Sequence, residues 1–94
     1  MTNLSLPKTV KISDNVLFQQ INDECVLLNM ESEQYFGLDE VGSRIWEILS
    51  ENGNTEAALQ VLLKEYDTNE ETLKRDLSVL LTDLEHEKLI SFEN

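Results

Sequence analysis

The sequence predicts an α+β fold in which a three-stranded antiparallel meander is followed by three helices. Two observations indicate this fold. Apolar residues follow a period of two between residues 16 and 37, and they recur with a helical period of about 3.6 from residue 39 onwards. Short polar segments that favour turns separate the apolar stretches. Strands segregated from helices along a chain are typical of a small sheet with helices packed on one face.

Three stretches have the composition of strands, in which β-branched and aromatic side chains fit the pleated surface. They are residues 16–21, 24–30 and 34–37, with turns expected at 22–23 and 31–33. In the middle stretch, Cys25, Leu27 and Asn29 share one face because side chains alternate along a strand. Turns this short join antiparallel neighbours, so the three strands form a meander.

Three helices are predicted after the strands. The first is capped by Asp39, whose side chain can accept a hydrogen bond from the first turn. The second begins at Asn54 or Thr55, and the third follows a capping box formed by Thr68 and Glu71. The expected apolar faces are Val41, Ile45, Trp46, Ile48 and Leu49 in the first helix, Ala58, Leu59, Leu62, Leu63 and Tyr66 in the second, and Leu73, Leu77, Leu80 and Leu84 in the third, at about 70–88.

The two ends of the chain carry weaker signals. Residues 1–13 include Pro7 and have no sustained apolar period, so we expect an N-terminal lead-in that can be flexible. Residues 14–94 then form a single domain, because a chain of 94 residues supports one modest core. Near the C-terminus, Ile90 and Phe92 are expected to lie in a short extended tail packed on the core.

The charge of the chain limits its partners. It has 19 acidic residues, 7 basic residues and one histidine, for a formal net charge of −12. This sign is wrong for binding the phosphates of nucleic acid or an anionic membrane, and it favours basic partners. The first residues lack the features of a signal peptide, and no apolar run approaches the ~18 residues of a membrane span. We therefore predict a soluble cytoplasmic protein that binds neither nucleic acid nor membrane.

Few residues could support catalysis or bind a metal. His86 is the sole histidine and lies between Glu85 and Glu87, but no second histidine or thiol stands at a metal-binding spacing. A solvated helix face is therefore preferred to a general base or a ligand. Cys25, in an apolar strand, is interpreted as a buried structural thiol rather than a nucleophile. No phosphate loop or Ser-His-Asp set is present, so we predict no catalytic residue, no metal and no cofactor.

The strand at 34–37 has an edge that nothing in the sequence protects. Lysine, proline and bulges usually block such edges, and this strand has no lysine or proline. It also leads directly into the first helix. A free edge beside a helix can accept an extended peptide, whose backbone completes the ladder while pockets select its side chains. Two interpretations stay open: a peptide-docking edge, or an edge kept harmless by its shortness.

Three segments carry a resemblance to a known family. They are Val-Leu-Leu-Asn-Met at 26–30, Gln-Tyr-Phe-Gly-Leu-Asp-Glu-Val-Gly-Ser-Arg-Ile-Trp at 34–46, and Leu-Leu-Lys-Glu-Tyr-Asp at 62–67. Together with the leucine-rich third helix they resemble the PqqD-like family, that of coenzyme PQQ synthesis protein D, also called the RiPP recognition element. The resemblance covers about residues 16–92.

The resemblance implies a winged helix-turn-helix domain in stand-alone form. Such domains bind the leader of a ribosomally made precursor peptide, which adds as a strand beside the third strand and packs against the third helix. They have no catalysis of their own. They present the peptide to a tailoring enzyme: a radical SAM enzyme in PQQ-type pathways, or a leader peptidase and a cyclase in lasso-peptide pathways.

The resemblance also implies which residues bind the peptide. On the helix, Leu77 would be shared between groove and core, and Leu81 would be either a pocket floor or ordinary core. Lys74 and Arg75 could pair with acidic leader residues, although local partners on the same helix are slightly favoured. The implied peptide-binding residues are Gln34, Tyr35 and Phe36 on the strand and Lys74, Leu77, Ser78 and Leu81 on the helix.

Other functions compete with this one. A winged-helix transcriptional regulator would share the fold, but the net charge of −12 disfavours it. A small enzyme could use His86 or Cys25. A subunit of a larger complex could bind the tailoring enzyme without any preference for the peptide. A monomer or a weak homodimer is expected, since an open strand edge also permits self-pairing.

Overall fold

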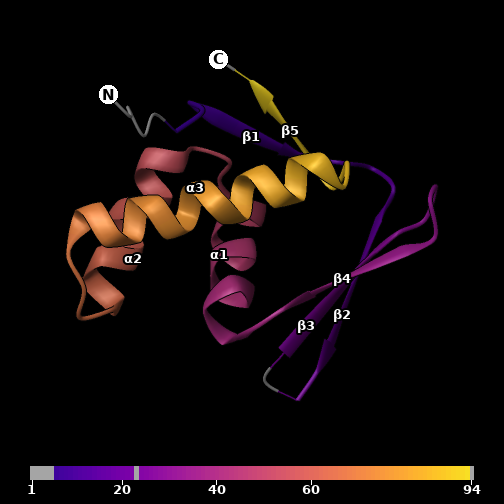
Figure 1. Ribbon diagram of the computed structural model, residues 1–94, viewed down its shortest axis with the longest axis horizontal. Helices are drawn as coiled ribbons and strands as arrows, with labels where there is room; N and C mark the ends of the chain where they lie inside the picture. The colour runs from indigo at the N-terminus through magenta and orange to yellow at the C-terminus, as the bar shows by residue number, and fades with distance from the viewer. Residues whose placement is uncertain (1–5, 23, 94) are drawn as a thin grey trace.

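The computed structural model describes residues 6–22 and 24–93 and confirms the predicted α+β architecture (Figure 1). Three strands form an antiparallel sheet in the order β2-β3-β4, and three helices follow them. The strands are β2 (Val16–Ile21), β3 (Glu24–Asn29) and β4 (Gln34–Leu38), and the helices are α1 (Glu40–Glu51), α2 (Thr55–Glu65) and α3 (Glu70–His86). Asp23, in the first predicted turn, lies outside the described residues.

A second, two-stranded sheet joins the two ends of the chain. Strand β1 (Thr9–Ile12) pairs antiparallel with β5 (Ile90–Glu93), with Val10 opposite Phe92. The expected extended tail is therefore a strand, and its first residue, Ile90, is buried. The prediction missed β1, because four residues show too little alternation and their partner lies at the other end of the chain. Figure 1 shows this pair along the side of α3 away from the meander.

The N-terminal segment before β1 also contacts the helices. Thr55, the first residue of α2, is buried, and its amide donates a 3.3 Å hydrogen bond to the carbonyl of Lys8. Its hydroxyl donates to the carbonyl of Pro7. Ordered structure thus begins inside the segment expected as a flexible lead-in, of which residues 1–5 lie outside the described part of the chain.

The core lies between the helices and the inner face of the meander. Cys25, Leu27 and Asn29 are buried on that face, as their alternation predicts. Trp46 of α1 is buried with them and is a core residue. The most completely buried side chains are leucines from β3, α2, α3 and the segment after α3: Leu27, Leu59, Leu62, Leu77, Leu81, Leu84 and Leu89.

The buried stripe of α3 differs from the expected one by one position. Leu81 is 1% exposed, whereas Leu80 is only partly buried, so the stripe continues from Leu77 to Leu84 through Leu81. Leu80 and Leu81 lie about 100° apart around the helix, and either one continues the spacing. The unpredicted β1–β5 sheet covers the flank that carries Leu81, which decides between them.

The helix caps follow the sequence with one correction. Asp39 caps α1 and accepts a 2.7 Å hydrogen bond from the amide of Gly42, as predicted. Helix α3 is capped by Asn69, which accepts a 2.7 Å bond from the amide of Thr72. The predicted capping box at Thr68 is therefore wrong by one residue. Asparagine is at least as good a cap as threonine, so the sequence offered two adjacent candidates.

Gly53 allows β1 to approach the connection between α1 and α2. The amide of Val10 donates a 2.8 Å hydrogen bond to the carbonyl of Gly53. A Cβ at Gly53 would lie 2.2 Å from the carbonyl oxygen of Val10.

We expect Gly53→Ala to lower the free energy of unfolding by about 1–3 kcal/mol, because backbone atoms would have to move apart. Urea denaturation measures this effect. Gly37→Ala is the matched control, since its Cβ would meet no atom within 4 Å. Equal stability of the two variants would contradict the packing described.

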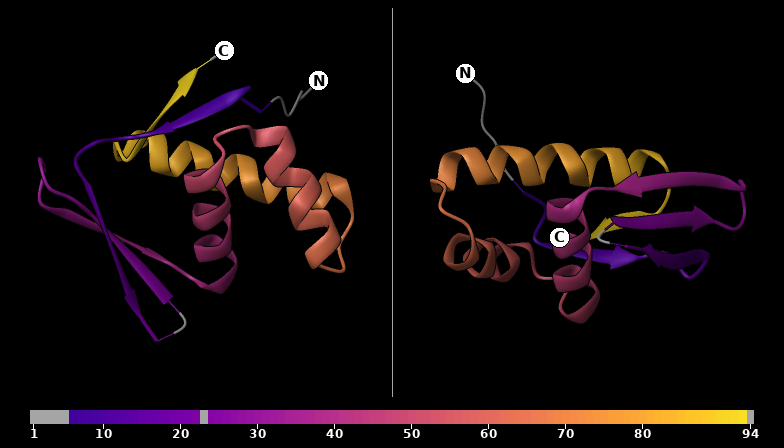
Figure 2. Two further views of the ribbon diagram at one scale, coloured as in Figure 1. Left: turned by 180° about the vertical axis from the view of Figure 1, so that it is seen from behind. Right: turned by 90° about the horizontal axis from the view of Figure 1, so that it is seen from below.

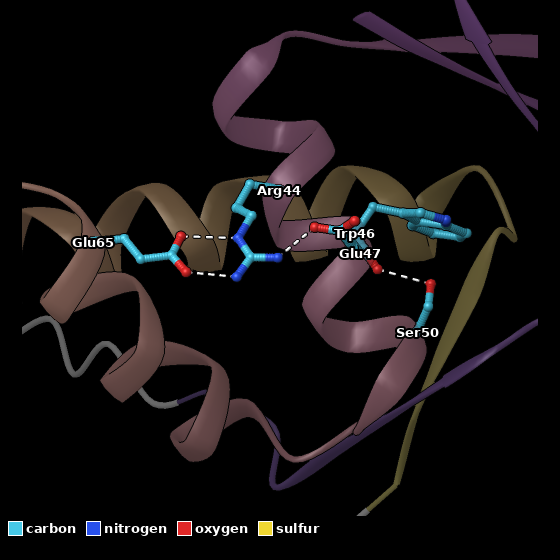
Figure 3. A network of polar contacts seen from close by, with 5 residues as sticks. All are labelled: Arg44, Trp46, Glu47, Ser50 and Glu65. Atoms are coloured by element: carbon cyan, nitrogen blue, oxygen red, sulfur yellow. Dashed lines mark hydrogen bonds and ion pairs between the residues drawn. The ribbon is translucent and has the colours of Figure 1, made fainter. Parts of the chain in front are cut away.

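A surface ion pair joins α1 to α2 (Figure 3). Arg44 donates from Nε to Oε1 of Glu65 at 2.8 Å and from a second nitrogen to Oε2, and it also contacts Glu47. One turn further, the Ser50 hydroxyl donates a 2.8 Å bond to the Trp46 carbonyl. The hydrogen bonds from Arg44 hold the pKa of Glu65 below its ordinary value. The contacts therefore favour the folded state while Glu65 is ionised.

The lowered pKa of Glu65 predicts a small acid-dependent stability. A depressed carboxyl pKa stabilises the fold above the unfolded glutamate pKa of about 4.3, and this contribution is lost as the pH falls through the folded value. The melting temperature of Glu65→Gln should therefore lie below that of the unmodified chain near neutral pH, and the gap should close in acid. Thermal unfolding followed by circular dichroism between neutral and acid pH checks this. A gap that widens in acid would contradict it.

Candidate functional site

The outer edge of β4 is a free strand edge. Strand β4 stands at one end of the order β2-β3-β4, with β3 on its inner side only. The N-terminal strand β1 pairs with β5 and not with β4. Within residues 6–22 and 24–93, no backbone segment forms a ladder along this edge. The edge expected from the sequence is therefore present and accessible.

The register fixes which backbone groups point outward from β4. The amide of Met30, directly after β3, donates a 2.8 Å hydrogen bond to the carbonyl of Asn15. The backbone N–H and C=O groups of residues 26, 28 and 30 therefore point towards β2. Hydrogen-bonding direction alternates along an antiparallel strand. The intervening residues of β3 therefore bond to Gln34, Phe36 and Leu38. The N–H and C=O groups of Tyr35 and Gly37 point away from the sheet, where an added strand would meet them.

The side chains of β4 alternate between the two faces of the sheet. Phe36 pairs with buried Leu27 on the inner face and is partly buried against the core. Tyr35 pairs with Leu28 on the opposite face and is 69% exposed. An added strand would thus lie beside an aromatic side chain on each face. The structure brings Gln34, Tyr35 and Phe36 together at this edge, as the resemblance implies.

Asn29 ties the start of β4 to the end of α3. Its side chain is buried, and its Nδ2 donates a 3.0 Å bond to the carbonyl of Glu87. Its Oδ1 accepts bonds from the amides of Glu31 at 2.9 Å and Ser32 at 3.2 Å, in the turn between β3 and β4. Figure 2, right, shows β4 as the strand of the meander nearest α3. The alternation along β3 predicts the inner face for Asn29 but not these hydrogen bonds. An Asn directly before a turn is a local signal for the two turn bonds, because its side chain bonds backbone two residues on, whereas the bond to Glu87 has no local signal.

Two of the helix residues implied by the resemblance, Lys74 and Ser78, lie on the flank of α3 that runs beside the N-terminal segment and the β1–β5 sheet. Lys74 lines a hollow with Pro7 and Thr55, towards the N-terminal segment. Glu85, further along the same flank, lines a hollow with residues of β1 and β5. Ser78 lies between them in helical spacing and is half-buried. The assignment of Lys74 and Ser78 to the peptide site therefore stays a prediction from the resemblance.

The opposite flank of α3 runs to the end of the helix that Asn29 ties to the turn before β4. It carries Asp76, Leu80 and Asp83 at steps of four and three, and it leads to Glu87, whose carbonyl Asn29 holds. Leu80 is partly buried on this flank, where it packs against the core and leaves some apolar surface exposed. Leu77 and Leu81 are buried in the core and pack α3 against the rest of the domain. Arg75 has a local partner, Glu71, at 3.5 Å.

The other candidate residues have ordinary environments. The side chain of His86 is 84% exposed and lies 3.5 Å from Glu87, and Cys25 is buried and unbridged. A hollow of about 540 Å³ lies between β2 and α1, lined by Phe18, Trp46 and Arg44 among others. Within the part of the chain that the structure describes, no three His, Cys, Asp or Glu side chains are grouped to hold a metal. None of the described helices is both long and apolar enough for a membrane span.

A comparison with models of protein families identifies the family of this chain. The model of coenzyme PQQ synthesis protein D (PqqD) matches residues 24–90. The chain belongs to the PqqD family. The match runs from the start of β3 to the first residue of β5 and therefore includes the free edge of β4 and the whole of α3. Strands β1 and β2 lie outside it.

Two solved structures share the fold of this PqqD-family chain. One is TbiB1 in complex with the TbiA(beta) leader peptide, which is 40% identical, has a TM-score of 0.83, and aligns over 89% of this chain and 98% of its own. The other is a lasso peptide synthetase B1 complexed with the leader peptide, at 22% identity and a TM-score of 0.80, over 88% of this chain and 98% of its own. A search of curated proteins finds no match.

Proposed function

We propose that this PqqD-family protein binds the leader of a precursor peptide as an added strand along β4. The free edge with the outward N–H and C=O groups of Tyr35 and Gly37 is the observation that carries the proposal. Backbone bonds along such an edge supply affinity for an extended peptide, and adjacent side chains supply selectivity. The 40% identical TbiB1, which aligns over nearly its whole length, is in complex with a leader peptide.

The proposed peptide-binding residues combine the strand with the near flank of α3. Gln34, Tyr35 and Phe36 contact the peptide directly, and Leu80 forms the apolar wall on the helix. Of the helix residues first implied, Leu77 and Leu81 act by supporting this wall from the core. Lys74 lines a hollow beside the N-terminal segment, and Ser78 lies one turn further along α3, so the two are proposed as outlying members of the site.

The protein itself is proposed to be non-catalytic. It presents the bound peptide to a tailoring enzyme, such as a leader peptidase, a lasso cyclase or a radical SAM enzyme, in the cytoplasm. Residues 14–94, extended by the packed strand β1, form the peptide-recognition domain. Transcriptional regulation is disfavoured because the exposed side of α3 includes Glu70, Glu71, Asp76 and Asp83, which repel DNA phosphates.

Titration of a fluorescent leader peptide tests this function. The probes are the leader of the precursor encoded beside this chain and the TbiA(beta) leader, and a scrambled peptide of the same composition is the control. The expected dissociation constant for the neighbouring leader is micromolar or tighter, about −8 kcal/mol. Binding weaker than about 1 mM, or equal binding of the scrambled peptide, would overturn the proposal.

A further inference from the structure

The face of the meander that points away from the helices is apolar. The pairing register places side chains of Leu17, Leu28 and Tyr35 in one row across the three strands. A neighbouring row contains Gln19, Val26 and Gly37. We call this surface the outer face, and its apolar side chains are Leu17, Ile21, Val26, Leu28, Met30 and Tyr35.

No described element covers the outer face. Leu17, Ile21 and Met30 are 50%, 52% and 49% exposed. A Cβ at Gly37 would meet no atom within 4 Å. Figure 2, left, shows all three helices to one side of the meander. Scattered exposed apolar residues are normal, but a continuous apolar surface across three strands is typical of an interaction site.

The charges around the outer face indicate what kind of partner covers it. Glu24 stands at one end of the strands, and Glu31 and Glu33 stand in the turn at the other end, all exposed. A second copy of the chain, also at −12, would bring the same carboxylates towards these. A partner with an apolar patch rimmed by lysine and arginine would pair with them instead. The acidic rim formed by Glu24, Glu31 and Glu33 therefore favours binding of a different protein over self-association.

The outer face is continuous with the proposed peptide site. A peptide strand paired with β4 would place every second side chain on this same face, next to Tyr35 and Gly37. A protein seated on the outer face would then touch the domain and the captured peptide together. Such a protein would distinguish the loaded domain from the empty one.

We propose that the outer face is the docking surface for the enzyme that processes the captured peptide, and that this enzyme carries a complementary apolar patch with a basic rim. The proposal rests on the proposed leader-binding function, because the bound leader completes the surface. It assigns separate surfaces to the two tasks: the edge of β4 with α3 for the peptide, and the outer face for the enzyme.

The test uses a double variant on β2, Leu17→Ser with Ile21→Ser, far from the peptide edge. The probes are the purified tailoring enzymes encoded in the same gene cluster, each titrated against the full chain with and without the leader. We expect at least one enzyme to bind the unmodified chain more tightly when the leader is present. The double variant should bind that enzyme at least tenfold more weakly and bind the leader within twofold of the unmodified chain. Both residues are half-exposed, so folding should survive; circular dichroism checks this.

Val79→Ser is the matched control, because Val79 is 57% exposed on α3, away from the outer face. It should leave both affinities within twofold. Exchanging Glu31 and Glu33 together for lysine should weaken enzyme binding as well, since it reverses the charge of one rim. Unchanged enzyme binding by the double variant would overturn the proposal. So would analytical sedimentation that shows a dimer of the unmodified chain and a monomer of the double variant. If the enzyme binds through the outer face but no leader binds at all, the proposed function fails, and with it the part of this proposal in which the leader completes the surface, while the contact between the outer face and the enzyme stands.

Discussion

Replacement of Gly37 by proline is expected to weaken leader binding by roughly tenfold to a hundredfold while the fold persists. The N–H of Gly37 points out of the sheet, so proline removes no bond of the β3–β4 ladder. It does remove a donor from the peptide's side and leaves a carbonyl of the guest strand without a partner, at a cost of about 1–3 kcal/mol. Titration of the fluorescent leader measures the loss, and urea denaturation verifies the fold.

Two controls isolate the effect of the backbone donor. Gly37→Ala keeps the N–H and adds a methyl group in open space, so leader affinity should stay within about threefold. Gln20→Pro removes an outward N–H from the opposite edge of the sheet, on β2, and should leave leader binding unchanged. Full affinity in Gly37→Pro, or an equal loss in Gln20→Pro, would contradict strand addition at β4.

Truncation of Leu81 is expected to have the largest effect on stability. Leu81 is 1% exposed, so Leu81→Ala should lower the free energy of unfolding by about 2–5 kcal/mol through lost burial and the cavity left behind. That is a large share of the 5–15 kcal/mol typical of a small domain. Leu80→Ala should cost only about 1 kcal/mol, because Leu80 is partly exposed.

The same pair of variants separates stability from binding. Leu80→Ala should reduce leader affinity several-fold, since Leu80 is proposed to form the helix wall of the peptide site. Leu81→Ala should act on binding only through the folded fraction. Denaturation and peptide titration of both variants check this. A greater loss of stability from Leu80 than from Leu81 would contradict the orientation of α3.

The local sequence determines much of this fold. Alternation with two short turns was enough to place the three strands of the meander, and the helical spacing and Asp39 were enough to place α1. The free edge also follows from local features, since nothing in Gln34–Leu38 protects it. Each of these features depends on residues within a few positions of one another.

The features that escaped prediction depend on contacts between distant parts of the chain. Strand β1 is ordered by β5, from the opposite end of the sequence, and this pair then decides which side of α3 is buried. Without this pair, the helical spacing alone does not distinguish Leu80 from Leu81 as the buried residue. Asn29 organises the site through the carbonyl of Glu87, a bond spanning 58 residues that no local pattern reveals.

Hydrogen exchange of individual amides, with and without the leader, reports directly on strand addition along β4. We expect the amides of Tyr35 and Gly37 to become strongly protected when the leader binds, because an added strand accepts their hydrogen bonds. The outward amides of Phe18 and Gln20, on the β2 edge, should exchange as before. A leader that binds while Tyr35 and Gly37 exchange unchanged, or that protects the β2 edge instead, would contradict it.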